Sequence, residues 1–243
     1  MQHAVVTEQE WLTARKVLLA KEKELTHLRD QVRQARQELP WVKVTKQYTF
    51  DTPSGKKTLA DLFDGRSQLL IQHFMLGPGD KAGCPMCSLL ADEYDGILSH
   101  LENHDVSLVA VSRGTLPEIE SYKKRMGWRF PWVSSTGTDF NFDYNVSFSA
   151  EKNPNGKGTY NYSEMPLPPN LAGMELPGMS AFAKNEAGEV FHTYSCYARG
   201  LEDVMGVLML LDRAPLGRNE KGTMDFVRRH DEYTNPKTHS CCS

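Results

Sequence analysis

Hydrophobic positions in the middle of the chain follow the pattern of an α/β protein with a parallel sheet. Residues 69–76 and 106–111 form nearly continuous apolar runs, which are typical of strands buried on both faces. Between them, apolar residues repeat at helical spacing from Leu90 to Leu101, and a capping box at Thr115 predicts a second helix after the second run. This order of elements predicts right-handed βαβ units around a parallel core.

The segments that follow predict how this sheet is completed. Residues 180–184 and 190–194 flank a glycine-bearing loop and predict a β-hairpin, and residues 201–211 predict a closing helix. Before the hairpin, residues 135–176 are rich in Asn, Gly, Pro and Ser and have little periodicity. A stretch this long inside a compact domain is usually functional or ordered by packing, so we treat it as an insertion.

Residues 7–39 predict one long helix, with a capping box between Thr7 and Glu10 and a stop at Pro40. Its apolar positions form a heptad seam that is interrupted only at Lys21. The seam either packs on the chain's own domain or pairs with the same helix in a homodimer, and the pattern alone allows both. The residues of the seam are Trp11, Ala14, Leu18, Leu25, Leu28, Val32, Ala35 and Leu39.

These patterns divide the 243 residues into an N-terminal amphipathic helix (1–40), a domain (41–215) and a C-terminal tail (216–243). In the tail, the basic cluster 228–230 is interpreted as a solvated surface. A net charge of −3 gives no electrostatic signal for nucleic acid or an anionic membrane. No apolar run approaches the roughly 20 residues that span a bilayer, and the first 16 residues contain no signal-peptide core. We therefore expect a cytoplasmic protein.

The motif Cys84-Pro85-Met86-Cys87 lies between the buried strand and the first helix, and it carries the strongest functional signal. Two cysteines with this spacing can close into a disulfide and reopen. Unpaired N–H groups at the start of the helix stabilise a thiolate, so we expect the pKa of Cys84 to lie below the free value of about 8.5. Cys84 is then the attacking sulfur, Cys87 the resolving one, and Met86 a residue that tunes them.

The other cysteines do not complete a metal site. A zinc site needs four ligands, usually a second close pair of Cys or His, and the chain offers only Cys196 and the vicinal Cys241 and Cys242. Cys196 is interpreted as a packed residue, and the vicinal pair lies on a polar tail. Dithiol redox chemistry is the favoured interpretation, with no metal and no cofactor.

The order of elements and the position of the cysteines resemble the thioredoxin fold over residues 45–213, and residues 63–69 and 109–113 look like its peroxiredoxin-related branch. The whole chain resembles a bacterial family of predicted dithiol-disulfide oxidoreductases catalogued as a domain of unknown function. This resemblance implies a thioredoxin-like α/β/α sandwich that reacts with a thiol or disulfide substrate. The runs that carry it are residues 39–42, 60–67, 83–88, 126–135, 139–143, 191–195, 197–200 and 228–233.

One position departs from the wider thioredoxin pattern. Thioredoxins place a cis-proline just before the hairpin strand, against the cysteine pair. With Phe182 aligned to the corresponding strand residue, that position is Met179, and the nearest proline is Pro177. The resemblance therefore gives Pro177 as a candidate substrate contact.

Two rival functions use the same residues. A thiol peroxidase needs a Thr or Ser three residues before its reactive cysteine and a nearby arginine; Lys81 stands at that position before Cys84, while Arg113 is a candidate charge partner. A soft-metal protein would bind Cu(I) through the cysteines with His73 or His192 as a third ligand. Each histidine lies in an apolar strand, where a structural role is the more common one.

Overall fold

The computed structural model describes residues 3–169, 171 and 173–233, and the chain forms two units, Met1–Trp41 and Val42–Ser243. The first unit consists of helix α1 (Glu8–Gln37), which begins with the predicted capping box: the Glu10 N–H donates to Thr7 Oγ1 over 3.3 Å. The long N-terminal helix is thus confirmed. No residue of α1 is buried, and none of the helices in the described part of the chain is long and apolar enough to cross a membrane.

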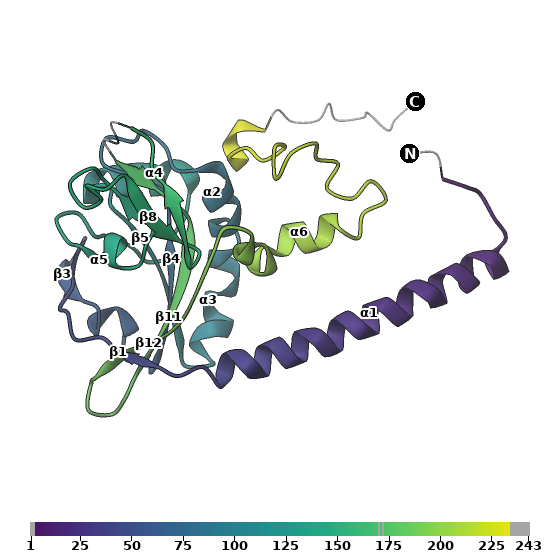
Figure 1. Ribbon diagram of the computed structural model, residues 1–243, viewed down its shortest axis with the longest axis horizontal. Helices are drawn as coiled ribbons and strands as arrows, with labels where there is room; N and C mark the ends of the chain where they lie inside the picture. The colour runs from purple at the N-terminus through teal and green to yellow at the C-terminus, as the bar shows by residue number, and fades with distance from the viewer. Residues whose placement is uncertain (1–2, 170, 172, 234–243) are drawn as a thin grey trace. The chain divides into compact units, whose positions relative to one another are not determined.

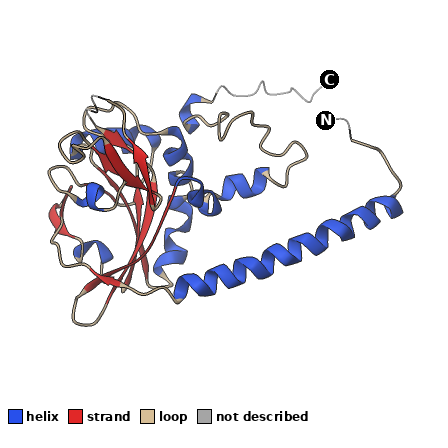
Figure 2. Cartoon of the chain, in the orientation of Figure 1, coloured by secondary structure: helices blue, strands red, loops and turns tan. Residues whose placement is uncertain are grey.

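The second unit is built on one twisted sheet, in which eight strands are found among the described residues (Figures 1 and 2). β4, β5 and β6 run parallel, β11 lies antiparallel to β4, and β12 lies antiparallel to β11. The parallel core and the hairpin are therefore confirmed. In spatial order the strands are β1 (Val42–Lys43), β12 (Val190–Tyr197), β11 (Gly178–Lys184), β4 (Gln68–His73), β5 (Val106–Ser112), β6 (Trp132–Ser134), β2 (Thr49–Thr52) and β3 (Gly55–Thr58).

Both faces of the sheet are covered. Along β5, Leu108 and Ala110 enter one hydrophobic core while Val109 and Val111 enter the other, because successive side chains of a strand point to opposite faces. The first core packs against the helices after the cysteines, and the second contains Phe140 of the insertion. The thioredoxin-like α/β/α arrangement is confirmed. The helices of this unit are η1 (Asp61–Phe63), α2 (Pro85–Ala91), α3 (Tyr94–Glu102), α4 (Leu116–Met126), α5 (Phe140–Asp143), η2 (Ala198–Val204), α6 (Gly206–Leu211) and η3 (His230–Glu232).

Two predicted helices are each divided in the structure. The helical pattern after the cysteines is split between α2 and α3 at Asp92 and Glu93, whose carboxylates bind distant segments: Asp92 accepts the indole N–H of Trp128 at 2.8 Å. Glu93 accepts the N–H groups of Gly206 and Val207 at 3.0 and 2.9 Å. These hydrogen bonds cap the start of α6, which lies in the middle of the single helix that the sequence predicts over residues 201–211. These tertiary hydrogen bonds outweigh local periodicity.

The insertion is ordered by packing. Its described residues form α5 and four short strands. The centre of the Tyr144 ring lies 4.7 Å from that of Phe140 and 5.3 Å from that of Phe182 on β11. A hairpin of the insertion also touches the end of the sheet, where the hydroxyl of Tyr160 binds the carbonyl of Pro177 at 2.7 Å. The short strands are β7 (Ser147–Phe148), β8 (Lys157–Tyr160), β9 (Ser163–Pro166) and β10 (Met174–Glu175).

The segment from 216 to 233 has little regular secondary structure, yet it contributes to the core of the sheet. Met224 and Val227 are buried in the same cluster as Cys87 and Leu90. Residues near the end of the chain therefore pack beside the cysteine motif.

Substitution of Gly83, the residue before Cys84, tests how closely the chain is packed around the cysteine motif. A Cβ added at Gly83 would lie 2.8 Å from Tyr122 and closer still to the ring of Phe74, whereas one added at Gly96 in α3 meets open space. We expect Gly83→Ala to lower the free energy of unfolding by about 1–3 kcal/mol through overpacking. The control Gly96→Ala should raise it by roughly 0.5–1 kcal/mol, because alanine favours a helix. Urea unfolding of the reduced proteins measures both, and equal effects would contradict this account of Gly83.

Candidate active site

The cysteine motif lies where the chain leaves the carboxyl end of β4 and begins α2. Cys84 is the N-cap residue of that helix, with Pro85 in its first turn. The Cys84 N–H donates to the carbonyl of Met75 at 3.1 Å, and the Ser88 N–H donates to the carbonyl of Cys84 at 2.9 Å. Both ends of the Cys84 backbone are therefore held, and its side chain stands at the start of the helix.

The two thiols differ in exposure and in acidity. Cys84 is half-buried, whereas Cys87 is 3% exposed, and both are free thiols. A hydrogen bond from Cys87 lowers the pKa of Cys84 to about 6; burial opposes this shift, and the N–H groups of Cys87 and Met86 add to it. The same hydrogen bond, together with burial, raises the pKa of Cys87 well above its usual value. Near neutral pH the pair therefore holds one thiolate, on Cys84, and one thiol.

Arg229 is a site residue that the sequence interpretation missed. Its Nε and Nη2 atoms donate to the carbonyl oxygen of Gly83 at 2.9 and 2.6 Å, and its side chain is only 19% exposed. Its positive charge also helps to lower the pKa of Cys84. The interpretation of residues 228–230 as a solvated surface is thus wrong for Arg229. The one signal in the sequence was that the run 228–233 belongs to the hallmarks of the family resemblance.

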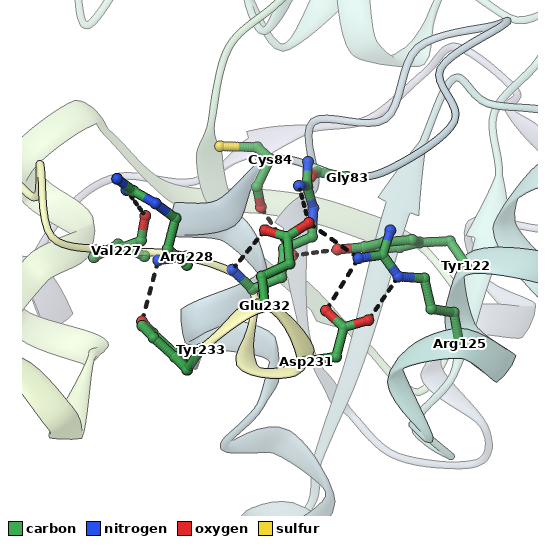
Figure 3. Close-up of polar contacts among 11 residues, drawn as sticks. Gly83, Cys84, Tyr122, Arg125, Val227, Arg228, Asp231, Glu232 and Tyr233 are labelled. Carbon is green, nitrogen blue, oxygen red and sulfur yellow. Dashed lines mark hydrogen bonds and ion pairs between the residues drawn. The ribbon is translucent and has the colours of Figure 1, made fainter. Parts of the chain in front are cut away.

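Residues 227–233, which we call the C-terminal clasp, are fixed to two helices beside the motif. Arg125 of α4 binds both carboxylate oxygens of Asp231, at 2.7 and 3.0 Å (Figure 3). His230 binds Asp92 at the end of α2 over 2.6 Å. Because the ion pair between Arg125 and Asp231 is bidentate, it orients the clasp more strongly than a single surface pair would.

Arg113, the other candidate arginine, is engaged elsewhere. It forms an ion pair of 2.9 Å with Glu175 of β10, and its guanidinium lies 4.4 Å from the centre of the Phe142 ring. The arginine whose charge acts on Cys84 is Arg229.

Pro177, Met86 and Cys87 meet at a cavity of about 210 Å³. Pro177 directly precedes β11, and no cis peptide bond occurs in the described ranges, so Pro177 is trans. The remaining walls come from Gln72 on β4, from Leu90 of α2, from η2 with Met205, and from the segment around Met224. Three of the residues proposed from the sequence therefore come together at this cavity, and Arg113 does not line it.

The histidines considered as metal ligands bind serines instead. On β4, Gln72 faces α2 and donates to the carbonyl of Cys87 at 3.2 Å, so the next side chain, His73, points to the opposite face. There the Nε2 atom of His73 lies 2.7 Å from Ser180 Oγ, and burial lowers the pKa of His73 to about 3. His192 likewise binds Ser195 at 2.7 Å.

No group of three or more His, Cys, Asp and Glu side chains placed to hold a metal ion occurs in residues 3–169, 171 and 173–233. Cys196 lies half-buried on β12 at the edge of the core that contains Cys87. Cys241 and Cys242 lie outside the described residues.

Comparison with known proteins gives one family and several similar structures. The sequence model of the family described as "Bacterial protein of unknown function (DUF899)" matches residues 1–233. A mutant of PrxQ from Xylella fastidiosa is 15% identical, with 67% of this chain and 88% of that chain covered and a TM-score of 0.41. Peroxiredoxin Q from Xanthomonas campestris (12%; 68% and 96% covered) has a TM-score of 0.42, and peroxidoxin BcpB from Mycobacterium tuberculosis (11%; 71% and 97% covered) has 0.39. None of the curated proteins matches the chain.

The acidity of Cys84 can be measured by alkylation. A thiol reacts with iodoacetamide as the thiolate, so the rate rises with pH through the pKa. With the pKa of Cys84 lowered to about 6, the rate should reach half its maximum near that pH. At pH 7 about 90% of Cys84 would be thiolate, against about 3% for a free cysteine. A midpoint near that of a free cysteine would contradict the assignment.

Arg229→Gln should move this midpoint to higher pH, because it removes a positive charge and leaves the Gly83 carbonyl without its partner. Arg228→Gln is the matched control, since Arg228 is exposed and its side chain donates to the carbonyl groups of Val227 (Figure 3) and Asp225 rather than to that of Gly83. Fragmentation of the alkylated peptide in the mass spectrometer distinguishes Cys84 from Cys87, which lie on the same peptide. Equal shifts in the two variants would exclude a specific role for Arg229.

Proposed function

The chain belongs to the DUF899 family of bacterial proteins, and from its site we propose that it is a thiol-disulfide oxidoreductase with Cys84 as nucleophile and Cys87 as resolving cysteine. The observation that carries this proposal is the asymmetry of the pair. One sulfur is acidic and half-exposed, and the other is buried and holds its proton. A thiolate attacks disulfides, whereas a thiol does not.

The reaction proceeds in two exchanges. The Cys84 thiolate attacks one sulfur of the substrate disulfide, forms a mixed disulfide, and releases the other sulfur as a thiolate that takes a proton from solvent. Loss of the negative charge on Cys84 removes an interaction that holds the pKa of Cys87 high. Cys87 then gives up its proton and attacks Cys84, so that the substrate leaves as two thiols and the protein holds one disulfide.

The thiol peroxidase alternative has weaker support from the site. The hydroxyl that would assist a peroxide is replaced by the exposed side chain of Lys81, and Arg113 is already paired with Glu175. Five cysteines at irregular spacing do not suit a framework of structural disulfides, and in a reducing compartment a pair with this spacing is more often catalytic than structural.

A glutathione redox titration tests the dithiol function. The wild-type chain should show one two-electron transition that joins Cys84 to Cys87, and Cys84→Ser should abolish it. Cys87→Ser should accumulate a stable glutathione adduct on Cys84, because nothing resolves it. Cys196→Ser, a control on β12, should titrate like the wild type. Accumulation of sulfenic acid on Cys84 with peroxide, and no internal disulfide, would favour the peroxidase instead.

We also propose a second copy of the chain as the partner of α1, whose seam residues Leu18 and Leu25 are 51% and 46% exposed. A seam of this kind stabilises paired helices. The double substitution of Leu18 and Leu25 by Glu should convert a dimer to a monomer in light scattering, whereas Leu19→Glu, one position off the seam, should not. A wild-type chain that is monomeric at all concentrations would refute this partner.

A further inference from the structure

One residue that lines the cavity beside Cys87 carries a buried polar atom without a partner among the described residues. Gln72, which is 1% exposed, lines the cavity and donates its Nε2 hydrogen to the Cys87 carbonyl, so its Oε1 atom is left as an acceptor. No donor within the described residues reaches that oxygen. An unpaired buried acceptor costs about 1–3 kcal/mol, which a donor supplied by a ligand would recover.

The remaining walls of the cavity are chiefly apolar. Met86, Leu90, Leu201 and Met205 line it, and the described charged residues at its edge, Arg199 and Glu202, bind each other at 2.7 Å. Glu202 also binds Arg218 at 2.7 Å, so its charge is doubly compensated. The cavity therefore suits an uncharged apolar group, and no free charge is available to hold an ionic one.

The size of the cavity limits what can enter it. Its volume is about 210 Å³, and an apolar cavity of about 150 Å³ in another protein binds benzene. One aromatic ring or a short branched alkyl chain with a single polar group therefore fits.

Tyr160 of the insertion holds the part of the cavity wall that contains Pro177 and Ala198. The hydroxyl of Tyr160 donates to the carbonyl of Pro177 and accepts the N–H of Ala198 at 2.9 Å, and both of these residues line the cavity. The Tyr160 ring packs 5.4 Å from that of Tyr197. The hairpin β8–β9 thus fixes the cavity beside the resolving cysteine.

We propose that this cavity binds the organic group of the substrate: an uncharged aromatic or branched aliphatic substituent that bears an N–H donor for Gln72 Oε1, attached to a disulfide. The inference rests on the dithiol function proposed above. The substituent occupies the cavity while Cys84 attacks the sulfur that carries it, and this sulfur leaves as a thiol when Cys87 closes the internal disulfide. The substrate gains two electrons and two protons, and the dithiol of the protein supplies the electrons.

Three disulfides test the proposal on the reduced full-length chain. The disulfide of N-benzoylcysteamine has an aromatic ring and an amide N–H, its ester counterpart has oxygen in place of that N–H, and bis(hydroxyethyl) disulfide has neither. Single-turnover rate constants for formation of the Cys84–Cys87 disulfide are divided by the rates of the same probes with dithiothreitol, which removes intrinsic reactivity. We expect the amide to exceed both the ester and the hydroxyethyl probe by about tenfold or more.

Two variants test whether the preference for the amide probe arises in the cavity. Gln72→Met should reduce the amide-to-ester ratio to about one, because it removes the acceptor and keeps the length of the side chain. Met205→Trp should reduce the ratio of amide to hydroxyethyl probe by about tenfold, because it fills the cavity. Leu216→Trp is the control: Leu216 is 75% exposed, does not line the cavity, and should leave both ratios unchanged.

The outcomes distinguish failure of the proposed substrate class from failure of the proposed dithiol function. Wild-type ratios near one, or an amide preference that persists in Gln72→Met, would overturn the substrate class while the dithiol function stands. Failure of all three probes to join Cys84 to Cys87 would overturn the dithiol function itself. Because the readouts are ratios within one protein, a general loss of reactivity in a variant does not imitate either result.

Discussion

A hydrogen bond between two sulfur atoms sets the chemistry of this protein. It lowers the pKa of Cys84 and raises that of Cys87, so that in the proposed reaction this one bond makes Cys84 the attacking cysteine and Cys87 the resolving one. The bond depends on the placement of Cys87 in the first turn of α2 and of Cys84 at its cap. A hydrogen bond to Met75, just after β4, holds Cys84, and one from Gln72 on β4 holds Cys87. Each interaction that stabilises the thiolate also stabilises the reduced protein, so it makes the disulfide easier to reduce.

The sheet positions this pair, but irregular segments from distant parts of the sequence surround it. The clasp brings Arg229 to the Gly83 carbonyl, and the insertion brings Tyr160 to the wall of the cavity. This division is common in α/β proteins, where a rigid scaffold carries loops that determine what is bound. The insertion and residues 216–233 thus both contribute to the proposed site, although neither has the periodicity of a sheet or helix.

The sequence predicts the features that depend on local order. The strands around Ile71 and Val109, and the cysteine pair between strand and helix, follow from periodicity and spacing. It does not predict that Arg229 contacts Gly83, because these residues are 146 positions apart and no local pattern connects them. The division between α2 and α3 is also missed, since Asp92 and Glu93 suit an exposed helix until their distant partners are known.

The same separation along the chain determines the order in which the parts of the proposed site are synthesised. A growing chain is synthesised from its N-terminus at about 5–20 residues per second, so Arg229 emerges roughly 7–30 s after Gly83, given the 146 positions between them. During that interval βαβ units of the sheet can fold around Cys84, but the arginine that contributes to its acidity is absent. Until Arg229 arrives, the nascent Cys84 therefore lacks one of the interactions that lower its pKa in the finished protein.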